Sequence, residues 1–373
     1  MQILVDENIP YAAQMLHPFG QVTTFPGREL KPNQLKDIDT LLIRSITQVN
    51  ASLLEHANCL KYVGTATIGT DHVDQSLLAK KEILFSSAPG CNAKSVADYI
   101  LSALCHIEES EGWQLRDKTI GIVGIGNIGR QVASMLKALN VRCLLCDPLV
   151  EPDPVLGEWV DYATLLSQSD CVTFHVPLTK EGKFTTFQML SDEQLAIMKP
   201  NAVIMNASRG DVIDNQALLR AKQGGRKMPL VLDVWQGEPK ILEELIPFTQ
   251  IATAHIAGYS LEGKAKGTYQ LAQWLSQHEK ITLEQPFSSF LPASPFEEIH
   301  ISHPMTWDTV RKFVHLVYDV LRDDVMFRRL FNEKGFDWLR KHYPERRELS
   351  VLPINIADQD SKHVLSALGF TVL

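Results

Sequence analysis

The sequence lacks the features of a membrane protein, a disulfide-rich secreted protein or a general nucleic-acid binder. No apolar run approaches the ~18–20 residues that a membrane-spanning helix needs. The six cysteines are scattered through apolar segments, as is usual for reduced thiols. The formal net charge of -8 argues against binding to nucleic acid or to a membrane surface, although it is compatible with a local basic pocket for an anionic substrate.

The amino-terminal stretch also lacks a basic region followed by an apolar segment, so we expect no signal peptide and a cytoplasmic protein. Internal repeats and long low-complexity segments are absent as well. The chain of 373 residues has 45% hydrophobic and 21% charged residues, which is typical of a globular protein with enough chain for two or three domains.

Strand-like apolar runs alternate with helix-like segments in residues 1–90 and again, with stronger signals, in residues 117–256. This alternation predicts parallel sheets with crossover helices. Residues 92–109 carry apolar side chains at helical spacing and are expected to lead from the first region into the second. A helix directly after Tyr259 is expected to return the chain to the first region.

Three glycines form a G-x-G-x-x-G motif between an apolar strand and an amphipathic helix, which is the context that a dinucleotide site requires. Gly124 makes the tight turn, Gly126 lets the backbone approach a pyrophosphate, and Gly129 lets the helix pack on the strand. The helix begins at Asn127 and Ile128, where free N–H groups would face the phosphates.

An aspartate ends the next apolar run. Asp147 can accept hydrogen bonds from a ribose 2′-hydroxyl and would repel a 2′-phosphate, which favours NAD over NADP. In isolation, such an aspartate would more often be a solvated strand end. Cys143 and Cys146 in the same run form a C-x-x-C, but residues three apart on a strand point to opposite faces, so we predict core cysteines rather than a redox pair or half a zinc site.

A cation, a carboxylate and an imidazole follow later strand-like stretches. These are Arg209, Glu238 and His255, and the carboxyl ends of parallel strands are where such sheets bind ligands. Arg209 can hold a carboxylate with its planar fork, His255 can move a proton, and Glu238 can orient the imidazole. Each residue alone would more often be structural. Together, behind a dinucleotide loop, they favour oxidation of a 2-hydroxy acid by hydride transfer.

Over residues 1–285 the chain resembles the D-isomer-specific 2-hydroxyacid dehydrogenases, in the stretches GIVGIGNIG, NASRGDVID, DVWQGEP and TAHIAGYS. The resemblance implies catalysis by Arg209, Glu238 and His255, with His255 as proton donor or acceptor. For substrate contacts it implies Ser45, Thr67 and Tyr259. For NAD contacts it implies Asp147, Val176, Ala207, Ser208, Arg209, Asp233 and Gly258. Val176 is a departure, because relatives carry threonine there.

The stretches ILVDENIPYA, VGTATIGTDHVD and FVHLVYDVLRDD, with the tail past residue 290, resemble one branch of that family. This resemblance implies oxidation of 4-phospho-D-erythronate at C2 to 2-oxo-3-hydroxy-4-phosphobutanoate, on the way to pyridoxal phosphate. A phosphate needs cationic partners, and Arg44 is one candidate. Arg346 and Arg347 are others if the tail of one subunit reaches a partner's cleft, but a solvated charge run is at least as good an interpretation.

The expected fold is therefore α/β, with two doubly wound parallel-sheet domains and a smaller third domain. We predict a Rossmann NAD-binding domain over residues 96–258 and a flavodoxin-like substrate domain over residues 1–95 and 259–285. The pattern of residues 286–373 predicts a small α/β domain. A segment of this length forms too small a hydrophobic core for much stability on its own. We expect it to pack on a partner subunit, and the resemblance implies a homodimer formed through it.

Other functions remain open at this level. A phosphoglycerate or a hydroxypyruvate/glyoxylate dehydrogenase would use the same catalytic set. An NAD-sensing binding protein could share the fold, since fold does not dictate function. The acidic charge and the lack of a DNA-binding segment disfavour that sensor, and Asp147 disfavours a flavin or NADP reductase.

Overall fold

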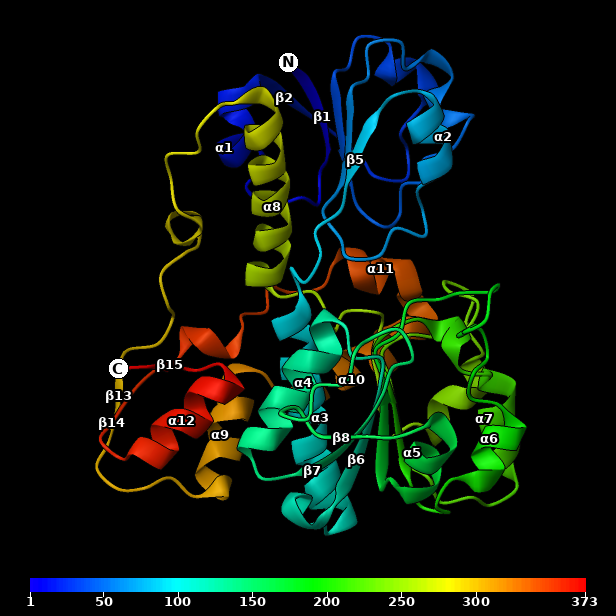
Figure 1. Ribbon diagram of the computed structural model, residues 1–373, viewed down its shortest axis with the longest axis vertical. Helices are drawn as coiled ribbons and strands as arrows, with labels where there is room; N and C mark the ends of the chain where they lie inside the picture. Colours follow the sequence, from blue (N-terminus) through cyan, green and yellow to red (C-terminus); the bar gives the residue numbers. More distant parts are fainter. The chain divides into compact units, whose positions relative to one another are not determined.

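The computed structural model describes residues 1–373 and divides into two compact units (Figure 1). Unit 1 comprises Met1–Asn92 and Tyr259–Ala293, and unit 2 comprises Ala93–Gly258 and Ser294–Leu373. None of the helices combines the length and the apolar character that crossing a membrane requires.

Unit 1 is built on a parallel sheet with the strand order β2-β1-β3-β4-β5. The order reverses at β1, which pairs with both β2 and β3, so the sheet is doubly wound in the flavodoxin-like manner. Its strands are β1 (Gln2–Asp6), β2 (Gln21–Phe25), β3 (Thr40–Ile43), β4 (Tyr62–Thr65) and β5 (Leu84–Ser86). Its helices are α1 (Ala12–Leu16), α2 (Gln75–Lys80), α8 (Leu261–Glu279) and the short 3-10 turns η1 (His17–Phe19), η2 (Pro32–Leu35), η3 (Leu53–His56) and η7 (Phe287–Phe290).

Alternate residues of unit 1's strands enter two cores, one on each face of the sheet. Ile3 and Val5 of β1 pack with residues of α1 and α8, whereas Leu4 packs with the core on the other face. Both β3 and β4 are buried along their whole length. A strand covered on both faces is mostly apolar, which is why these segments are mainly apolar in the sequence, with one buried threonine in each, Thr40 and Thr65.

Unit 2 contains a larger parallel sheet with the order β12-β11-β10-β9-β6-β7-β8. Its strands are β6 (Thr119–Val123), β7 (Arg142–Cys146), β8 (Glu158–Trp159), β9 (Cys171–Phe174), β10 (Val203–Asn206), β11 (Leu230–Leu232) and β12 (Ile251–Ala252). Its helices are α3 (Ala93–Glu111), α4 (Asn127–Ala138), α5 (Tyr162–Gln168), α6 (Asp192–Ile197), α7 (Asn215–Gln223) and the 3-10 turns η4 (Leu115–Asp117), η5 (Gly210–Val212), η6 (Glu243–Phe248). The helices α3 and α4 lie on one side of this sheet and α5, α6 and α7 on the other (Figure 1).

In the sheet of unit 2, β6 and β9 are neighbours near the centre, and the order of the strands runs in opposite directions from this pair. This is the doubly wound arrangement of dinucleotide-binding domains, in which the ligand crevice opens at the carboxyl ends of the two strands. The prediction of an α/β fold with two doubly wound parallel sheets is confirmed.

The carboxyl-terminal tail adds a small parallel sheet, β13-β14-β15, to unit 2. Its elements are β13 (Ile299–Ile301), α9 (Trp307–Val317), α10 (Val320–Lys334), α11 (Phe336–Lys341), η8 (Leu349–Val351), β14 (Pro353–Ile356), α12 (Gln359–Leu368) and β15 (Thr371–Val372). Phe327, Phe336 and Leu339 of α10 and α11 belong to the same core cluster as Trp235 and Leu232. The tail therefore shares a hydrophobic core with the large sheet.

Candidate active site

The glycine loop joins β6 to α4 through a backbone that only glycine adopts easily. Gly124 has φ 89°, and a Cβ there would come within 2.8 Å of the His175 carbonyl. A Cβ on Gly129 would clash with the carbonyl oxygen of Gly124, so the helix can approach the strand only with glycine at this position. A Cβ on Gly126 would meet no atom within 4 Å, which leaves open space in front of the first turn of α4.

That open space is where a pyrophosphate fits, because the first N–H groups of α4 at Asn127 and Ile128 lack helical partners. Asp147 follows β7 and reaches the same loop. One of its oxygens accepts a hydrogen bond from Ile125 N at 2.8 Å, and the other accepts one from Leu149 N at 3.0 Å. The residues present thus suit NAD, with a partly exposed carboxylate beside the glycine loop for the ribose.

Val176 lies at the same loop from the neighbouring strand. It follows β9, and its Cγ1 would be 2.7 Å from a Cβ on Gly124. His175 beside it is buried, and burial lowers the pKa of this imidazole to about 3. Nε2 of His175 lies 3.0 Å from Oγ1 of Thr173, so this neutral imidazole makes a local hydrogen bond at the end of β9. The two thiols of β7 stay protonated at neutral pH, because burial raises the pKa of Cys143 to about 12 and that of Cys146 to about 11.

Three strands end level with one another on the other half of the sheet. Asn206 of β10 pairs with Leu232 of β11, which pairs in turn with Ala252 of β12. Arg209 follows the first of these strands and His255 the last. The register explains how residues far apart in sequence converge on one edge of the sheet.

Arg209 lies in a turn that Asn206 and Ser208 stabilise. Nδ2 of Asn206 donates to the Arg209 carbonyl at 2.9 Å, and Oδ1 of Asn206 accepts from Ser208 N at 3.0 Å. The guanidinium donates from Nη1 to the Ser208 carbonyl at 2.8 Å, and Ala207 and Ser208 are both buried. At the next residue, Gly210, a Cβ would clash with the carbonyl of Trp235, so the turn of Arg209 lies directly against the segment that leads to Glu238.

Glu238 and His255 form a pair. Nδ1 of His255 lies 2.8 Å from Oε2 of Glu238, and Oε1 of Glu238 accepts a hydrogen bond from Trp235 N at 2.8 Å. Burial raises the pKa of Glu238, but the charge and hydrogen bond of His255, the charge of Arg340 and the bond from Trp235 outweigh it and lower the pKa overall. An ionised carboxylate only accepts, so Nδ1 carries the proton and Nε2 remains the atom that can exchange a proton with substrate.

Asp233 holds the loop that carries His255. Its buried carboxylate accepts hydrogen bonds from Thr253 Oγ1 at 2.7 Å, Ile256 N at 2.7 Å and Ala257 N at 3.0 Å, and its carbonyl accepts from His255 N at 2.6 Å. His255 itself has φ 56°, a conformation that is uncommon for a residue with a side chain. These four bonds make that conformation stable. Gly258 ends the first of the two segments that make up unit 2.

The residues expected to contact substrate lie in unit 1. Ile43 and Thr65 pair at the carboxyl ends of β3 and β4, so the segments with Arg44, Ser45 and Thr67 leave the sheet at one edge. The guanidinium of Arg44 lies 5.0 Å from the centroid of the Tyr259 ring, and Arg44 Nη1 donates to the Asn8 carbonyl at 3.2 Å. Ser45 is exposed, and Thr67 Oγ1 donates to the Gly69 carbonyl at 3.0 Å.

Sequence reasoning missed a second cation at this place. Nζ of Lys264, in the first turn of α8, lies 6.0 Å from the centroid of the Tyr259 ring, so Arg44 and Lys264 both face that ring. The sequence contains a signal for this second cation in the stretch HIAGYSLEGKAKGT. Ser260 precedes the first residue of α8, so Lys264, four residues later, lies about one helical turn from Tyr259 at the amino-terminal end of that helix.

The charge run of the tail does not behave as a solvated surface segment at Arg346. This side chain is only 6% exposed, and its Nη2 donates to the Ser95 carbonyl at 2.9 Å and to the Ala257 carbonyl at 2.6 Å. Its guanidinium also lies 4.2 Å from the centroid of the Tyr318 ring. The interpretation as a solvated run is therefore wrong for Arg346, which is built into the core of unit 2 beside the loop of His255.

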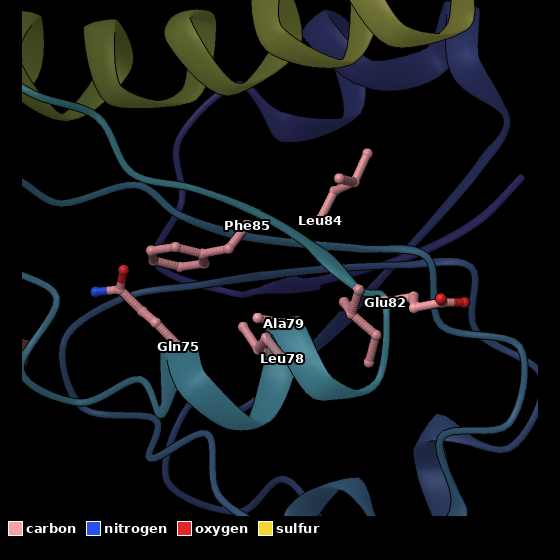
Figure 2. A pocket seen from close by; sticks show the side chains of 7 residues that line it. Gln75, Leu78, Ala79, Glu82, Leu84 and Phe85 are labelled. Carbon is pink, nitrogen blue, oxygen red and sulfur yellow. The ribbon is translucent and has the colours of Figure 1, made fainter.

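A pocket on unit 1 contains none of the predicted residues. It is lined by Gln75, Leu78, Ala79, Glu82, Ile83, Leu84 and Phe85, beside the edge strand β5 (Figure 2). Its walls carry one amide and one carboxylate among apolar side chains, which is a poor match to an anionic substrate.

Comparison with known proteins gives the following matches. The model of the family "D-isomer specific 2-hydroxyacid dehydrogenase, NAD binding domain" matches residues 101–257, and that of the domain of unknown function DUF3410 matches residues 290–369. Erythronate-4-phosphate dehydrogenase of Pseudoalteromonas translucida is 48% identical over 372 residues, covering 100% of both chains. The enzyme of that name from Aeromonas salmonicida is 47% identical, covering 100% of this chain and 99% of its own.

A solved structure gives a likeness in three dimensions. The D-lactate dehydrogenase of Aquifex aeolicus, complexed with NAD and lactic acid, superposes with a TM-score of 0.63 at 25% identity. The match covers 74% of this chain and 95% of that one.

Proposed function

Because the chain belongs to the D-isomer-specific 2-hydroxyacid dehydrogenase family, and erythronate-4-phosphate dehydrogenases match it from end to end, we propose that it oxidises 4-phospho-D-erythronate at C2 with NAD. The product is 2-oxo-3-hydroxy-4-phosphobutanoate, and the reaction belongs to the synthesis of pyridoxal phosphate. One observation carries the reaction type, namely the 2.8 Å contact between His255 Nδ1 and Glu238 Oε2 beside the turn of Arg209.

In this mechanism Arg209 binds the substrate carboxylate, because its planar fork matches two carboxylate oxygens. His255 Nε2 takes the proton of the C2 hydroxyl as the C2–O bond becomes a carbonyl. Glu238 stabilises the imidazolium that forms and fixes the ring through Nδ1. Bound NAD would supply the acceptor for the hydride that leaves C2. In the reverse direction the imidazolium returns its proton to the carbonyl oxygen.

The loop of Gly124, Gly126 and Gly129 would hold the cofactor, and the free N–H groups at the start of α4 would receive its phosphates. Asp147 would accept hydrogen bonds from the ribose hydroxyls. Further contacts come from Val176, Ala207, Ser208, Arg209, Asp233 and Gly258. A threonine hydroxyl is absent at position 176, so only the backbone there can contribute a polar contact.

Ser45, Thr67 and Tyr259 contact the substrate, and Arg44 with Lys264 supplies cations for its phosphate. Both cations face the Tyr259 ring, and a doubly charged phosphate is best held by more than one positive charge.

The tail forms a homodimer. In support, α9 and α10 are consecutive helices of the tail and carry three exposed large apolar side chains, Leu316, Leu321 and Val325, with 46%, 37% and 50% of their surface exposed.

The test is a panel of 2-hydroxy acids given to the purified protein with NAD, with NADH formation followed by absorbance. 4-Phospho-D-erythronate is compared with 3-phospho-D-glycerate, D-glycerate and D-lactate, and initial rates are used so that the oxo product does not accumulate. A kcat/KM for 4-phospho-D-erythronate at least about tenfold above the others, ~1.4 kcal/mol in the barrier, supports the proposal. Preference for another acid would support the reaction type but refute 4-phospho-D-erythronate as the substrate. The variant His255→Ala is the control for turnover by a contaminant.

A further inference from the structure

The carboxyl-terminal tail binds the segment that carries His255 at two places. Before the histidine, the backbone N–H of Ala252 in β12 donates to Oδ1 of Asp324 in α10 at 2.7 Å. After the histidine, the carbonyl oxygen of Ala257 accepts a hydrogen bond of 2.6 Å from Nη2 of Arg346. A distant part of the chain therefore holds this segment on both sides of its functional residue.

Ala257 is held through both of its backbone groups. Its N–H donates to Oδ2 of Asp233 at 3.0 Å. Its carbonyl oxygen accepts from Oγ of Ser95 at 2.8 Å as well as from Arg346, so both of its lone pairs have a donor. Because the peptide planes before and after Ala257 are both bound, the short link back to His255 has little rotational freedom.

Arg346 reaches this carbonyl from an enclosed position in the core of unit 2. Its side chain is buried, and its Nη2 also donates to the carbonyl of Ser95 at 2.9 Å and to the hydroxyl of the same residue. Its guanidinium lies 4.2 Å from the centroid of the Tyr318 ring. A planar fork held between a ring and the first turn of α3 keeps its donors aimed without further ordering.

The conformation of His255 makes this support relevant to catalysis. Its φ of 56° is uncommon for a residue with a side chain, so the loop must be stabilised by its neighbours. Asp233 binds N–H groups of the loop, whereas the carbonyl of Ala257 depends on Ser95 and Arg346. A misplacement of about 1 Å at a catalytic group can slow a reaction on the order of 10²-fold.

We propose that Arg346 is a positioning residue of the active site: from the tail it holds the carbonyl of Ala257, and thereby keeps the imidazole of His255 in place for proton transfer. This role rests on the proposed dehydrogenase reaction, and it gives the tail a part in turnover in addition to dimerisation. Arg346 acts through the backbone of the loop, so its replacement should lower kcat and leave the affinity for NAD, which depends mainly on the glycine loop, nearly unchanged.

The first experiment compares turnover of the parent with that of Arg346→Gln, Arg346→Lys, Ser95→Ala and the control Trp307→Phe. Trp307 is a matched control because its Nε1 donates to Oε2 of Glu108 at 2.6 Å, so it also joins the tail to α3, but near the other end of that helix. The kcat is expressed per NAD-binding site, which calorimetry counts.

We expect kcat of Arg346→Gln to fall at least about tenfold, with KM for the acid and the dissociation constant of NAD within about threefold of the parent. Arg346→Lys keeps a buried positive charge but loses the fork, so its kcat should lie between those of the parent and of Arg346→Gln. Ser95→Ala removes the other donor to the same carbonyl and should lower kcat several-fold. Trp307→Phe should keep the kcat of the parent.

A purely structural role predicts a different pattern. It would lower the midpoint of thermal unfolding of Arg346→Gln while kcat per site stays at the value of the parent, and this result would overturn the proposal. An equal loss of kcat in Trp307→Phe would also overturn it, because any loosening of the tail would then slow turnover. The milder variants Ser95→Ala and Arg346→Lys decide the matter if Arg346→Gln does not fold, and parental kcat in both would count against the proposal.

The second experiment needs no turnover, so it separates this inference from the proposed function. Hydrogen exchange of the peptide that contains residues 252–258 is measured by mass spectrometry, with the peptide of β6 (Thr119–Val123) as the internal reference. In Arg346→Gln the first peptide should exchange at least about tenfold faster and the reference should not change. Parental exchange of the first peptide, or equal acceleration of both, would show that Arg346 does not hold the loop, whichever acid the enzyme oxidises.

Discussion

Replacement of Asp233 should release the loop of His255 without unfolding the rest of the protein. The side chain is 1% exposed and accepts hydrogen bonds from Thr253 Oγ1, Ile256 N and Ala257 N. The variant Asp233→Ala leaves these three donors buried without an acceptor, at about 1–3 kcal/mol each. Water that enters the cavity offsets part of this cost. We therefore expect the free energy for local opening of the loop to fall by about 3–6 kcal/mol.

Hydrogen exchange measured by mass spectrometry gives the loss directly. Because each ~1.4 kcal/mol is tenfold in the opening equilibrium, the peptide that contains residues 252–258 should exchange roughly 10²- to 10⁴-fold faster. The variant Asp233→Asn keeps one side-chain oxygen as an acceptor, so the exchange rate of this peptide should lie between those of the parent and of Asp233→Ala. Asp360→Asn, on the exposed start of α12, is the control and should exchange as the parent does. Exchange of this peptide in Asp233→Ala within about threefold of the parent would refute the reasoning, because threefold is only ~0.65 kcal/mol.

Three further predictions concern the cofactor site and the core. The variant Asp147→Ala removes the charge that repels a 2′-phosphate, so the ratio of kcat/KM for NADP to that for NAD should rise by about tenfold or more; an unchanged ratio would contradict the ribose role. The variant Gly129→Ala forces a Cβ against the Gly124 carbonyl and should weaken NAD binding at least about tenfold by calorimetry, while retained affinity would show that the loop adapts. Burial raises the pKa of Asp98 to about 7, so the Asp98 carboxyl stays protonated to a higher pH in the folded protein than in the unfolded chain. The free energy of unfolding should therefore fall as the pH rises from about 4 to about 7. The variant Asp98→Asn should lose that part of the pH dependence in urea titrations, and parallel curves for the two proteins would refute the assignment.

The features that sequence reasoning captured are local ones. Glycine spacing between a strand and a helix specifies the loop of Gly124, because a positive φ and a close helix approach leave no other residue for these positions. Apolar runs specify β6 and β10 because these strands are buried on both faces. The fold class, the NAD cofactor and the dehydrogenase class predicted from them are confirmed.

The features that it missed depend on contacts between distant parts of the chain. Nothing in the local pattern of the tail says that Phe327 stacks on Trp235, or that Asp324 caps β12. An arginine within a run of charges is normally solvated, yet Arg346 is buried because two carbonyls, those of Ser95 and Ala257, accept from it. Burial of this kind is decided by tertiary packing and has no periodic signature.

The central claim is that this chain transfers the C2 hydrogen of 4-phospho-D-erythronate to NAD, with His255 taking the hydroxyl proton. The most direct measurement is a single turnover with substrate deuterated at C2, followed by mass spectrometry of the recovered NADH, in the parent and in His255→Ala. The account predicts deuterium in the NADH of the parent at close to one equivalent per turnover, and none within the same time for His255→Ala despite unchanged NAD binding. Unlabelled NADH from the parent, or equal transfer in the variant, would contradict it.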